Sequence, residues 1–186
     1  MKNTIEKNRC YHGKRSMLGR VDIPLPRYKK EWYKVVCFCP VYLPDGTNGC
    51  RVYYDHDVCE DIPRSLDWVI NDWNSYHITT TSVLQQQSSH WLGNTARRRL
   101  PLVYNHNLCL VPVKFRAVRR AGDAVSGYAV LHKIQNIYTW KDEHTYLSFY
   151  SCGKSVMILE TRQTLEENVQ LGWQLLQFFE QEHHHP

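Results

Sequence analysis

The residues of this chain best suited to binding a ligand are arginines near its middle. Three follow one another at positions 97–99, and three more lie within positions 116–120. They bracket an apolar run, residues 108–113, that we expect to form a strand. Residues 85–124 carry seven Lys and Arg against a single Asp, and so many like charges repel one another. We therefore expect nucleic acid to lie across this strand; a solvated basic face is the alternative.

The candidate contacts to DNA are of three kinds. Central cations would bind phosphates, two polar side chains would add hydrogen bonds to phosphate or base edges, and N-terminal cations would enter the minor groove. A solvated tail with loose electrostatic attraction is an equal interpretation of that N-terminal segment. The central cations are Arg97, Arg98, Arg99, Lys114, Arg116, Arg119 and Arg120, the polar pair is Asn94 and Thr95, and the N-terminal cations are Lys14, Arg15 and Arg20.

Charge is segregated along the chain. Residues 1–36 carry ten Lys and Arg against three Asp and Glu, a net +7, and residues 85–124 carry a net +6. Residues 37–84 and 125–186 are acidic, at −5 and −3, which brings the total to +5. Such basic blocks are typical of an electrostatic footprint for phosphate.

A metal site is the second kind of chemistry to consider. Tetrahedral zinc takes four Cys or His ligands, and five candidates lie within the length of one hairpin. They lack the spacing of a paired C-x-x-C knuckle, so we expect free thiols and no cofactor, with a zinc-stabilised module as an alternative. These candidates are Cys37, Cys39, Cys50, His56 and Cys59.

The chain also contains acids that could serve catalysis and aromatic residues that could stack on bases. The acids at 55–57 and 60–61 accompany no Gly-rich nucleophile turn and no phosphate cradle, so we expect turn residues, no active site and no enzyme. Trp91, Tyr104 and Tyr128 flank the basic strand and could stack on bases, although packing in the core explains them more simply.

Composition indicates a globular intracellular protein. At 186 residues, with 42% hydrophobic and 12% aromatic residues, the chain suits one domain with its own core. No window approaches the ~20 apolar residues that cross a bilayer, and the first ten residues lack the apolar segment of a secretory signal. Seven cysteines without framework spacing fit reduced thiols. We expect a cytoplasmic, nucleoid-associated protein.

The expected organisation has three parts. Residues 1–31 contain few apolar residues, several Gly and Pro, and no periodicity, which predicts a flexible, mostly disordered basic arm. Residues 32–182 are expected to form a single DNA-binding domain. Residues 183–186 are expected to be a frayed tail.

The pattern of elements predicts an α+β fold, in which an antiparallel β-sheet packs against about two helices. A strand at 33–38, ended by Pro40, forms a hairpin with a strand at 50–54 across the turn-forming segment 44–49. Residues 79–92 are ambiguous and are read as a loop or short strand. Further strands are expected at 108–113, 128–134, 145–150 and 155–159, the last two joined by a tight turn at 152–154.

Two helices are expected. Pro63 opens the first, because its fixed φ suits a first turn, and residues 66–73 continue it to about residue 75 with apolar residues at helical spacing. A capping box of Thr164 and Glu167 starts the second. Its apolar stripe consists of Leu165, Val169, Trp173, Leu176 and Phe179.

Residues 88–180 resemble a known family in the order and spacing of several segments. These are a basic segment containing Gly93, then Leu100-Pro101-Leu102, an apolar strand ending in Pro112, Gly127-Tyr128-Ala129-Val130, the run from His132 to Ile137, and the run from Leu147 to Lys154 with a closing helix from Leu165. The family is the competence transcription factor ComK of Gram-positive bacteria. This chain departs from it in a shorter or shifted basic segment before Leu100 and in Tyr128, where the family usually has Trp.

The resemblance implies a DNA-binding activator of genetic competence, the DNA-uptake programme, that recognises AT-rich sites largely through the minor groove. It also implies self-association on double-stranded DNA and control by an adaptor–protease system. The competing class is a non-enzymatic protein-interaction module whose basic surface docks an acidic partner.

The first prediction concerns Arg98. Substitution Arg98→Ala is expected to weaken DNA binding across sequences and to lower the salt slope by about one, because one phosphate contact is lost. Binding isotherms at several salt concentrations measure both quantities. Unchanged affinity and slope across an alanine scan of residues 97–99 would remove these arginines from the interface.

Overall fold

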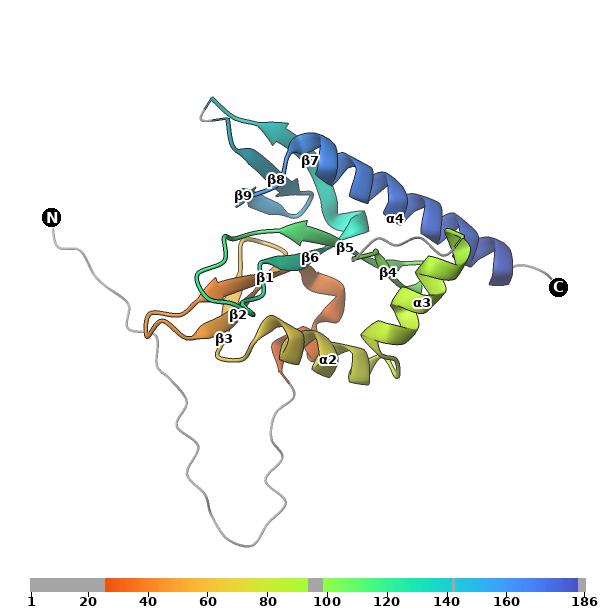
Figure 1. Cartoon of the computed structure of the whole chain (residues 1–186), viewed down its shortest axis with the longest axis horizontal. Coiled ribbons are helices and arrows are strands. Elements are labelled where there is room, and N and C mark those ends of the chain that lie inside the picture. The colour runs from red at the N-terminus through yellow and green to blue at the C-terminus, as the bar shows by residue number, and fades with distance from the viewer. Residues whose placement is uncertain (1–25, 94–98, 142, 184–186) are drawn as a thin grey trace, which may run out of the picture.

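The computed structural model describes residues 26–93, 99–141 and 143–183. Within these ranges, four helices and nine strands form three layers (Figure 1). A six-stranded antiparallel sheet lies in the middle. The helices α1 to α3 cover one of its faces, and a three-stranded antiparallel sheet with α4 covers the other. The fold class is therefore α+β, which confirms the expectation from sequence.

The central sheet has the strand order β3-β2-β1-β6-β5-β4. Side chains of a strand alternate between its faces, and here both faces are covered, so the inner strands are buried along almost their whole length. The strands are β1 (Val35–Tyr42), β2 (Asn48–Tyr54), β3 (Cys59–Ile62), β4 (Leu102–Asn105), β5 (Leu108–Lys114) and β6 (Ser126–Val130).

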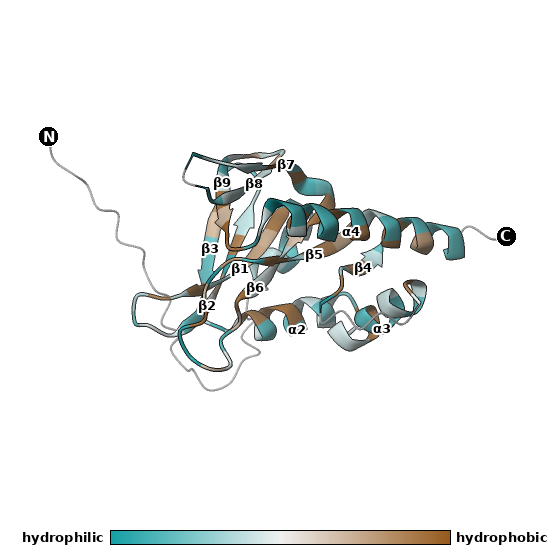
Figure 2. Cartoon of the chain, turned by 45° about the horizontal axis from the view of Figure 1, so that its top comes forward, coloured by the Kyte–Doolittle hydropathy of each residue, from teal (hydrophilic) through white to brown (hydrophobic). Residues whose placement is uncertain are grey.

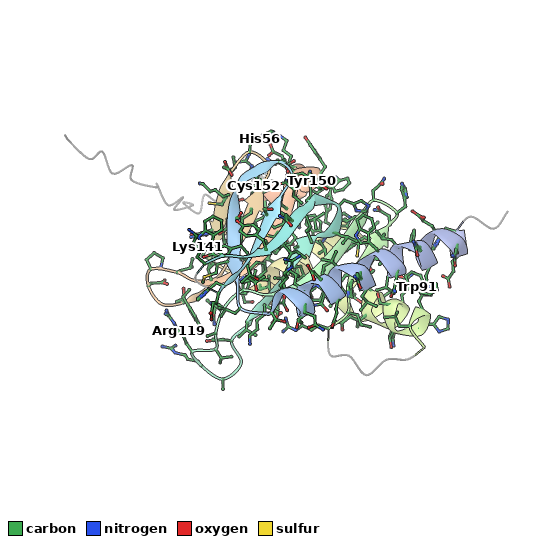
Figure 3. All side chains as sticks on the ribbon, turned by 90° about the horizontal axis from the view of Figure 1, so that it is seen from above. His56, Trp91, Arg119, Lys141, Tyr150 and Cys152 are labelled. Carbon is green, nitrogen blue, oxygen red and sulfur yellow. The ribbon has the colours of Figure 1, made fainter. Side chains whose placement is uncertain are left out.

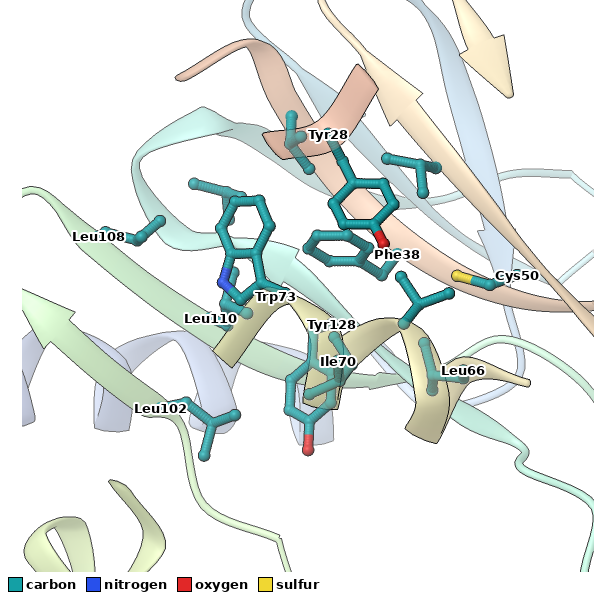
Figure 4. Packing of buried hydrophobic residues seen from close by; sticks show 14 of the residues in the cluster. Tyr28, Phe38, Cys50, Leu66, Ile70, Trp73, Leu102, Leu108, Leu110 and Tyr128 are labelled. Atoms are coloured by element: carbon teal, nitrogen blue, oxygen red, sulfur yellow. The ribbon is translucent and has the colours of Figure 1, made fainter. Parts of the chain in front are cut away.

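The first core lies between this sheet and the helices α1 (Arg27–Lys30), α2 (Leu66–Tyr76) and α3 (Thr81–Trp91). Trp73 of α2 is fully buried there, with its ring 5.1 Å from that of Phe38 and 6.5 Å from that of Tyr28 (Figure 4). Burying large aromatic rings contributes much of a core's stability. This core therefore fastens α1 and α2 to the sheet.

The second core lies on the opposite face. It is formed with β7 (Ile134–Thr139), β8 (Thr145–Phe149), β9 (Cys152–Ile158) and α4 (Arg162–His183). Phe149 and Leu165 are buried in it, and Gly172 lets α4 lie against the side chains of Val111 and Leu131. Figure 2 shows α4 teal on its outer side and the strands beneath it brown, as expected for an amphipathic helix over a buried sheet.

Two β-strand predictions are corrected. Strand β1 continues through Pro40 to Tyr42. The Pro40 ring faces Gly127 of β6, where the pairing between β1 and β6 has already ended. Because Pro40 has no pairing partner on that side, its lack of an N–H costs no hydrogen bond of the sheet. The segment expected as one strand at 128–134 is divided by a 3-10 turn, Leu131–Lys133, that carries the chain from one sheet to the other.

Other boundaries also differ. Residues 81–91 form helix α3, capped by Thr80, whose hydroxyl accepts from Val83 N at 3.3 Å. The tight turn expected at 152–154 lies at 150–151, because Cys152 already pairs with Phe149. The segment that was ambiguous in the sequence, residues 79–92, is thus mainly helical, with Leu84 and Ser88 buried in the fold.

The helix ends and the domain start need correction as well. Ser65 caps α2, in place of a start at Pro63. Helix α4 begins at Arg162, where the Thr161 hydroxyl accepts from Thr164 N at 3.2 Å, so the expected capping box is not used. Tyr28 is buried in the first core, which places the start of the domain before residue 32. Residues 27–30 of the expected arm form helix α1, and residues 1–25 lie outside the described residues.

The second prediction concerns the junction of β1 and β6. A Cβ on Gly127 would lie 2.0 Å from Phe38 O and 2.9 Å from Pro40 Cδ. Because backbone cannot yield easily, Gly127→Ala is expected to lower the free energy of unfolding by about 3 kcal/mol, as measured by urea denaturation. The control Ser126→Ala, one residue away, should change it by less than about 0.5 kcal/mol. Equal stability of both variants would contradict this description of the junction.

Candidate nucleic-acid interface

The candidate interface is built on the connection between β5 and β6, residues 115–125. Its base is closed by Val125 O, which accepts from Phe115 N at 2.9 Å and from Arg116 N at 3.2 Å. Gly122, at φ +87, allows the reversal at its tip. This short, closed connection carries three of the predicted arginines and follows Lys114 directly.

Arg116 fastens the connection to the β1–β2 hairpin. Its Nε donates to Ala124 O at 2.8 Å, and its Nη2 donates to Asn48 Oδ1 at 2.6 Å. The guanidinium lies over the Tyr42 ring, 3.8 Å from the centroid, where the negative face of the ring attracts the cation. Its buried Nη1 has no hydrogen-bond acceptor in the described part of the chain. Arg116 therefore positions the connection rather than projecting into solvent.

Tyr42 organises the neighbouring groups too. The Arg119 guanidinium lies 4.3 Å from the centroid of the same ring, and Arg119 N donates to the Tyr42 hydroxyl at 3.1 Å. That hydroxyl donates to Asp123, whose carboxylate also accepts from Asn48 Nδ2 and Arg120 N, both at 2.9 Å. These donors, the Tyr42 hydroxyl first, hold the pKa of Asp123 well below its usual range.

The remaining described cations lie beside this connection. Arg99 Nη1 donates to Ser126 O at 3.2 Å, and Ser126 is the register partner of Lys114. Lys114, Arg99, Arg119 and Arg120 are exposed, and Arg116 is half-buried. The structure thus brings five predicted residues to one end of the central sheet. We call this set the basic cluster: Arg99, Lys114, Arg116, Arg119 and Arg120.

The basic cluster differs from the other described cations in its electrostatic partners. In residues 26–93, 99–141 and 143–183, ion pairs join six other cations to carboxylates, and none includes a member of the cluster. Glu160 accepts from Lys114 N at 3.2 Å, and Asp123 accepts from Arg120 N at 2.9 Å. The five cations of the cluster outnumber these two carboxylates, so the cluster has a net positive charge.

Seven predicted site residues lie outside the described residues: Asn94, Thr95, Arg97, Arg98, Lys14, Arg15 and Arg20. Tyr42, Asn48 and Asp123 were not singled out from the sequence. Asp123 alone offered a signal, as the single acid of residues 85–124. The other two are 68 or more residues away from Arg116 and Arg119, the residues they contact.

The aromatic residues considered for base stacking have structural roles. Tyr128 is buried in the first core, and the Tyr104 hydroxyl donates to the buried Asn74. Trp91 packs edge-on against Phe179 of α4, with ring centroids 6.1 Å apart. Packing within the fold therefore explains all three residues, in agreement with the simpler of the two interpretations, core packing and base stacking.

The zinc alternative is not supported by the geometry. Cys37 and Cys39 point into the second core, whereas Cys50 points into the first, on the other face of the sheet. His56 and Cys59 are exposed. No three His, Cys, Asp or Glu side chains within the described ranges are grouped so that they could hold a metal ion.

The acids at 55–57 join the two sheets. Asp55 accepts from Lys133 Nζ at 2.9 Å and from the Ser151 hydroxyl, and His56 N donates to Ser151 O at 2.7 Å. Asp57 accepts from Cys152 Sγ at 3.1 Å, and burial raises the pKa of this thiol. Figure 3 shows His56 and Cys152 close together at this contact. Asp55 and Asp57 thus lie in a turn that joins the two sheets, as expected, whereas Glu60 and Asp61 belong to strand β3 and not to a turn.

Comparisons of this chain with protein-family models, with curated proteins and with solved structures found no match. No helix in the described part of the chain is long and apolar enough to cross a bilayer.

The third prediction concerns Tyr42. Substitution Tyr42→Phe keeps the ring beneath the guanidinium groups but removes the hydroxyl that donates to Asp123, so the pKa of Asp123 should rise. A carboxyl group whose pKa is lower in the folded than in the unfolded chain stabilises the fold at pH values above its unfolded pKa of about 3.9. This stabilisation is lost as the pH falls through the pKa of the folded state. The variant should therefore lose part of this contribution at neutral pH.

Carboxyl NMR titration and unfolding at pH 7 and pH 3 measure these changes. Tyr138→Phe, which removes a hydroxyl from a different sheet, is the control and should leave the titration of Asp123 unchanged. A pKa of Asp123 that is the same in Tyr42→Phe as in the unmodified protein would show that the hydroxyl does not hold the carboxylate.

Proposed function

We propose that this protein binds double-stranded DNA, with the basic cluster against the phosphates, and acts as a transcriptional activator. The observation that carries the proposal is the contrast in pairing. Six cations elsewhere in the described residues form ion pairs with neighbouring carboxylates, whereas the five cations of the cluster form none. Those with carboxylate partners are Arg27, Lys29, Lys34, Arg51, Lys133 and Arg162.

The arrangement of the cluster favours phosphates spaced along a backbone over a single anion. Arg116 and Arg119 are held by the same tyrosine ring, Arg99 and Lys114 flank the strand pair next to it, and Arg120 extends from the tip. Because the Tyr42 ring holds the exposed Arg119 guanidinium, less side-chain entropy is lost on binding. A preformed row of cations suits a regular polyanion.

The more specific part of the proposal depends on the resemblance to ComK. It is that the protein activates competence genes, prefers AT-rich sites, contacts them largely through the minor groove and self-associates on DNA. Arginine suits the narrow minor groove of AT-rich DNA, where the negative potential is enhanced. Control by an adaptor–protease system belongs to the same proposal.

The fourth prediction tests the cluster. Each phosphate contact contributes about 0.9 to the slope of log K against log[salt] on B-DNA. The double variant Arg119→Ala, Arg120→Ala should therefore lower the slope by about two and weaken binding to all duplexes. Arg27→Ala is the matched control, because this arginine is paired with Glu31 and stacked over Tyr54, at the other end of β2. An unchanged slope in the double variant would overturn the assignment of these two residues.

The same experiment separates DNA from an acidic protein partner. A salt-sensitive mobility shift that persists against competitor and prefers AT-rich over GC-rich duplex supports the proposal. Absence of any shift at low salt would reject DNA binding and favour the docking of an acidic protein on the basic cluster.

A further inference from the structure

The outer face of the three-stranded sheet carries aromatic side chains, of which Trp140 is exposed and Tyr138 and Tyr146 are half-buried. Tyr138 of β7 and Tyr146 of β8 are register partners, and their rings are 5.7 Å apart and nearly parallel, at 15°. Trp140 lies beside them at 69° to Tyr138, with 59% of its surface exposed. Met157, the register partner of Tyr146 on β9, extends this apolar row and is also exposed.

The three aromatic side chains and Ser155 line a shallow hollow of about 310 Å³. Two nearly parallel tyrosine rings and a tryptophan at a steep angle to them surround it. The Tyr138 hydroxyl donates to Ser155 Oγ at 2.8 Å, which places polar atoms within the hollow. A ligand with a flat ring and polar edges would match this combination of aromatic faces and hydroxyl groups. We call these residues the aromatic platform: Tyr138, Trp140, Tyr146 and Ser155.

The inner face of the same sheet accounts for its folding without the platform. Leu147, Phe149 and Ile158 point inward and are buried against the central sheet and α4. The outward aromatic residues therefore add exposed apolar surface that the core does not need. Exposed aromatic groups of this kind mark binding sites more often than isolated apolar residues do.

The platform lies at the same end of the molecule as the basic cluster. Thr139 pairs with Thr145, which pairs with Ile158, and the next backbone N–H, of Leu159, donates to Lys114 O at 2.7 Å. The turn after β7 adds an exposed cation, Lys141, which Figure 3 shows at the end where Arg119 lies. Backbone pairing thus connects the end of the strands that carry the platform with Lys114 of the basic cluster.

We propose that the aromatic platform stacks an unpaired nucleobase of a DNA strand whose phosphates contact the basic cluster. The inference extends the proposed function and rests on it. Positively charged grooves with aromatic side chains are the general means of binding single-stranded nucleic acid, since every base has a face that can stack. Bases within a duplex are covered on both faces by their neighbours, so only a base outside the stack can lie on the platform.

The test compares an oligo-dT strand of about 20 nucleotides with a duplex by fluorescence anisotropy. Trp140→Ala should weaken oligo-dT binding by about tenfold or more, while the salt slope and duplex affinity stay within about twofold. Trp140→Phe keeps a ring that can stack and should retain most of the affinity. Trp173→Ala, at a half-exposed tryptophan on α4, is the matched control and should bind both as the unmodified chain does.

Three outcomes would overturn the inference. Oligo-dT affinity unchanged in Trp140→Ala would reject the platform while leaving duplex binding by the cluster in place. Equal losses for strand and duplex would show that Trp140 does not act by stacking an unpaired base. If the unmodified chain binds neither DNA, the proposed function fails together with this inference. Thermal unfolding of each variant, expected to match the unmodified chain, distinguishes lost binding from lost fold.

Discussion

The structure depends on one close backbone approach in the middle of the central sheet. Strands β1 and β6 are joined by two register pairs, Cys37 with Ala129 and Phe38 with Tyr128, beside Gly127. Any side chain at Gly127 would meet the Phe38 carbonyl. Because strand side chains alternate, the same short junction supplies residues to both cores. It unites β3-β2-β1 with β6-β5-β4, which are separated in the sequence by α2 and α3.

That junction also brings the β1–β2 hairpin next to the connection 115–125, which carries the arginines of the basic cluster. Tyr42 and Asn48 belong to the β1–β2 hairpin, whereas the arginines that they hold follow β5. The tyrosine ring lies under two guanidinium groups, and its hydroxyl donates to Asp123. One neutral side chain therefore positions two like charges, and the Asp123 carboxylate beside them accepts from neutral donors and forms no ion pair with a guanidinium group.

The end of the molecule that carries the cluster combines two kinds of surface. Backbone pairing continues from the end of β7 through β8 and β9 to Lys114, so the strands that carry Tyr138 and Tyr146 are joined to the strand from which the connection 115–125 starts. Elsewhere in the described residues, six cations form ion pairs with carboxylates, and one of these pairs, Lys133 with Asp55, joins the β2–β3 turn to the second sheet. The five cations of the cluster form no such pair.

Sequence alone determined the fold class, the central strands and helix α2, because apolar periodicity and turn residues act over short distances. It also located the cationic stretch, since charge density is a property of composition. It could not determine helix α3, whose polar residues have weak preferences, or that Trp173 would be exposed beside the buried Gly172. Only the tertiary structure identified the residues that hold the arginines, which are Tyr42, Asn48 and Asp123. It also placed the strands of the aromatic platform next to Lys114. These residues are far apart in sequence, and the pairing of their strands brings them together.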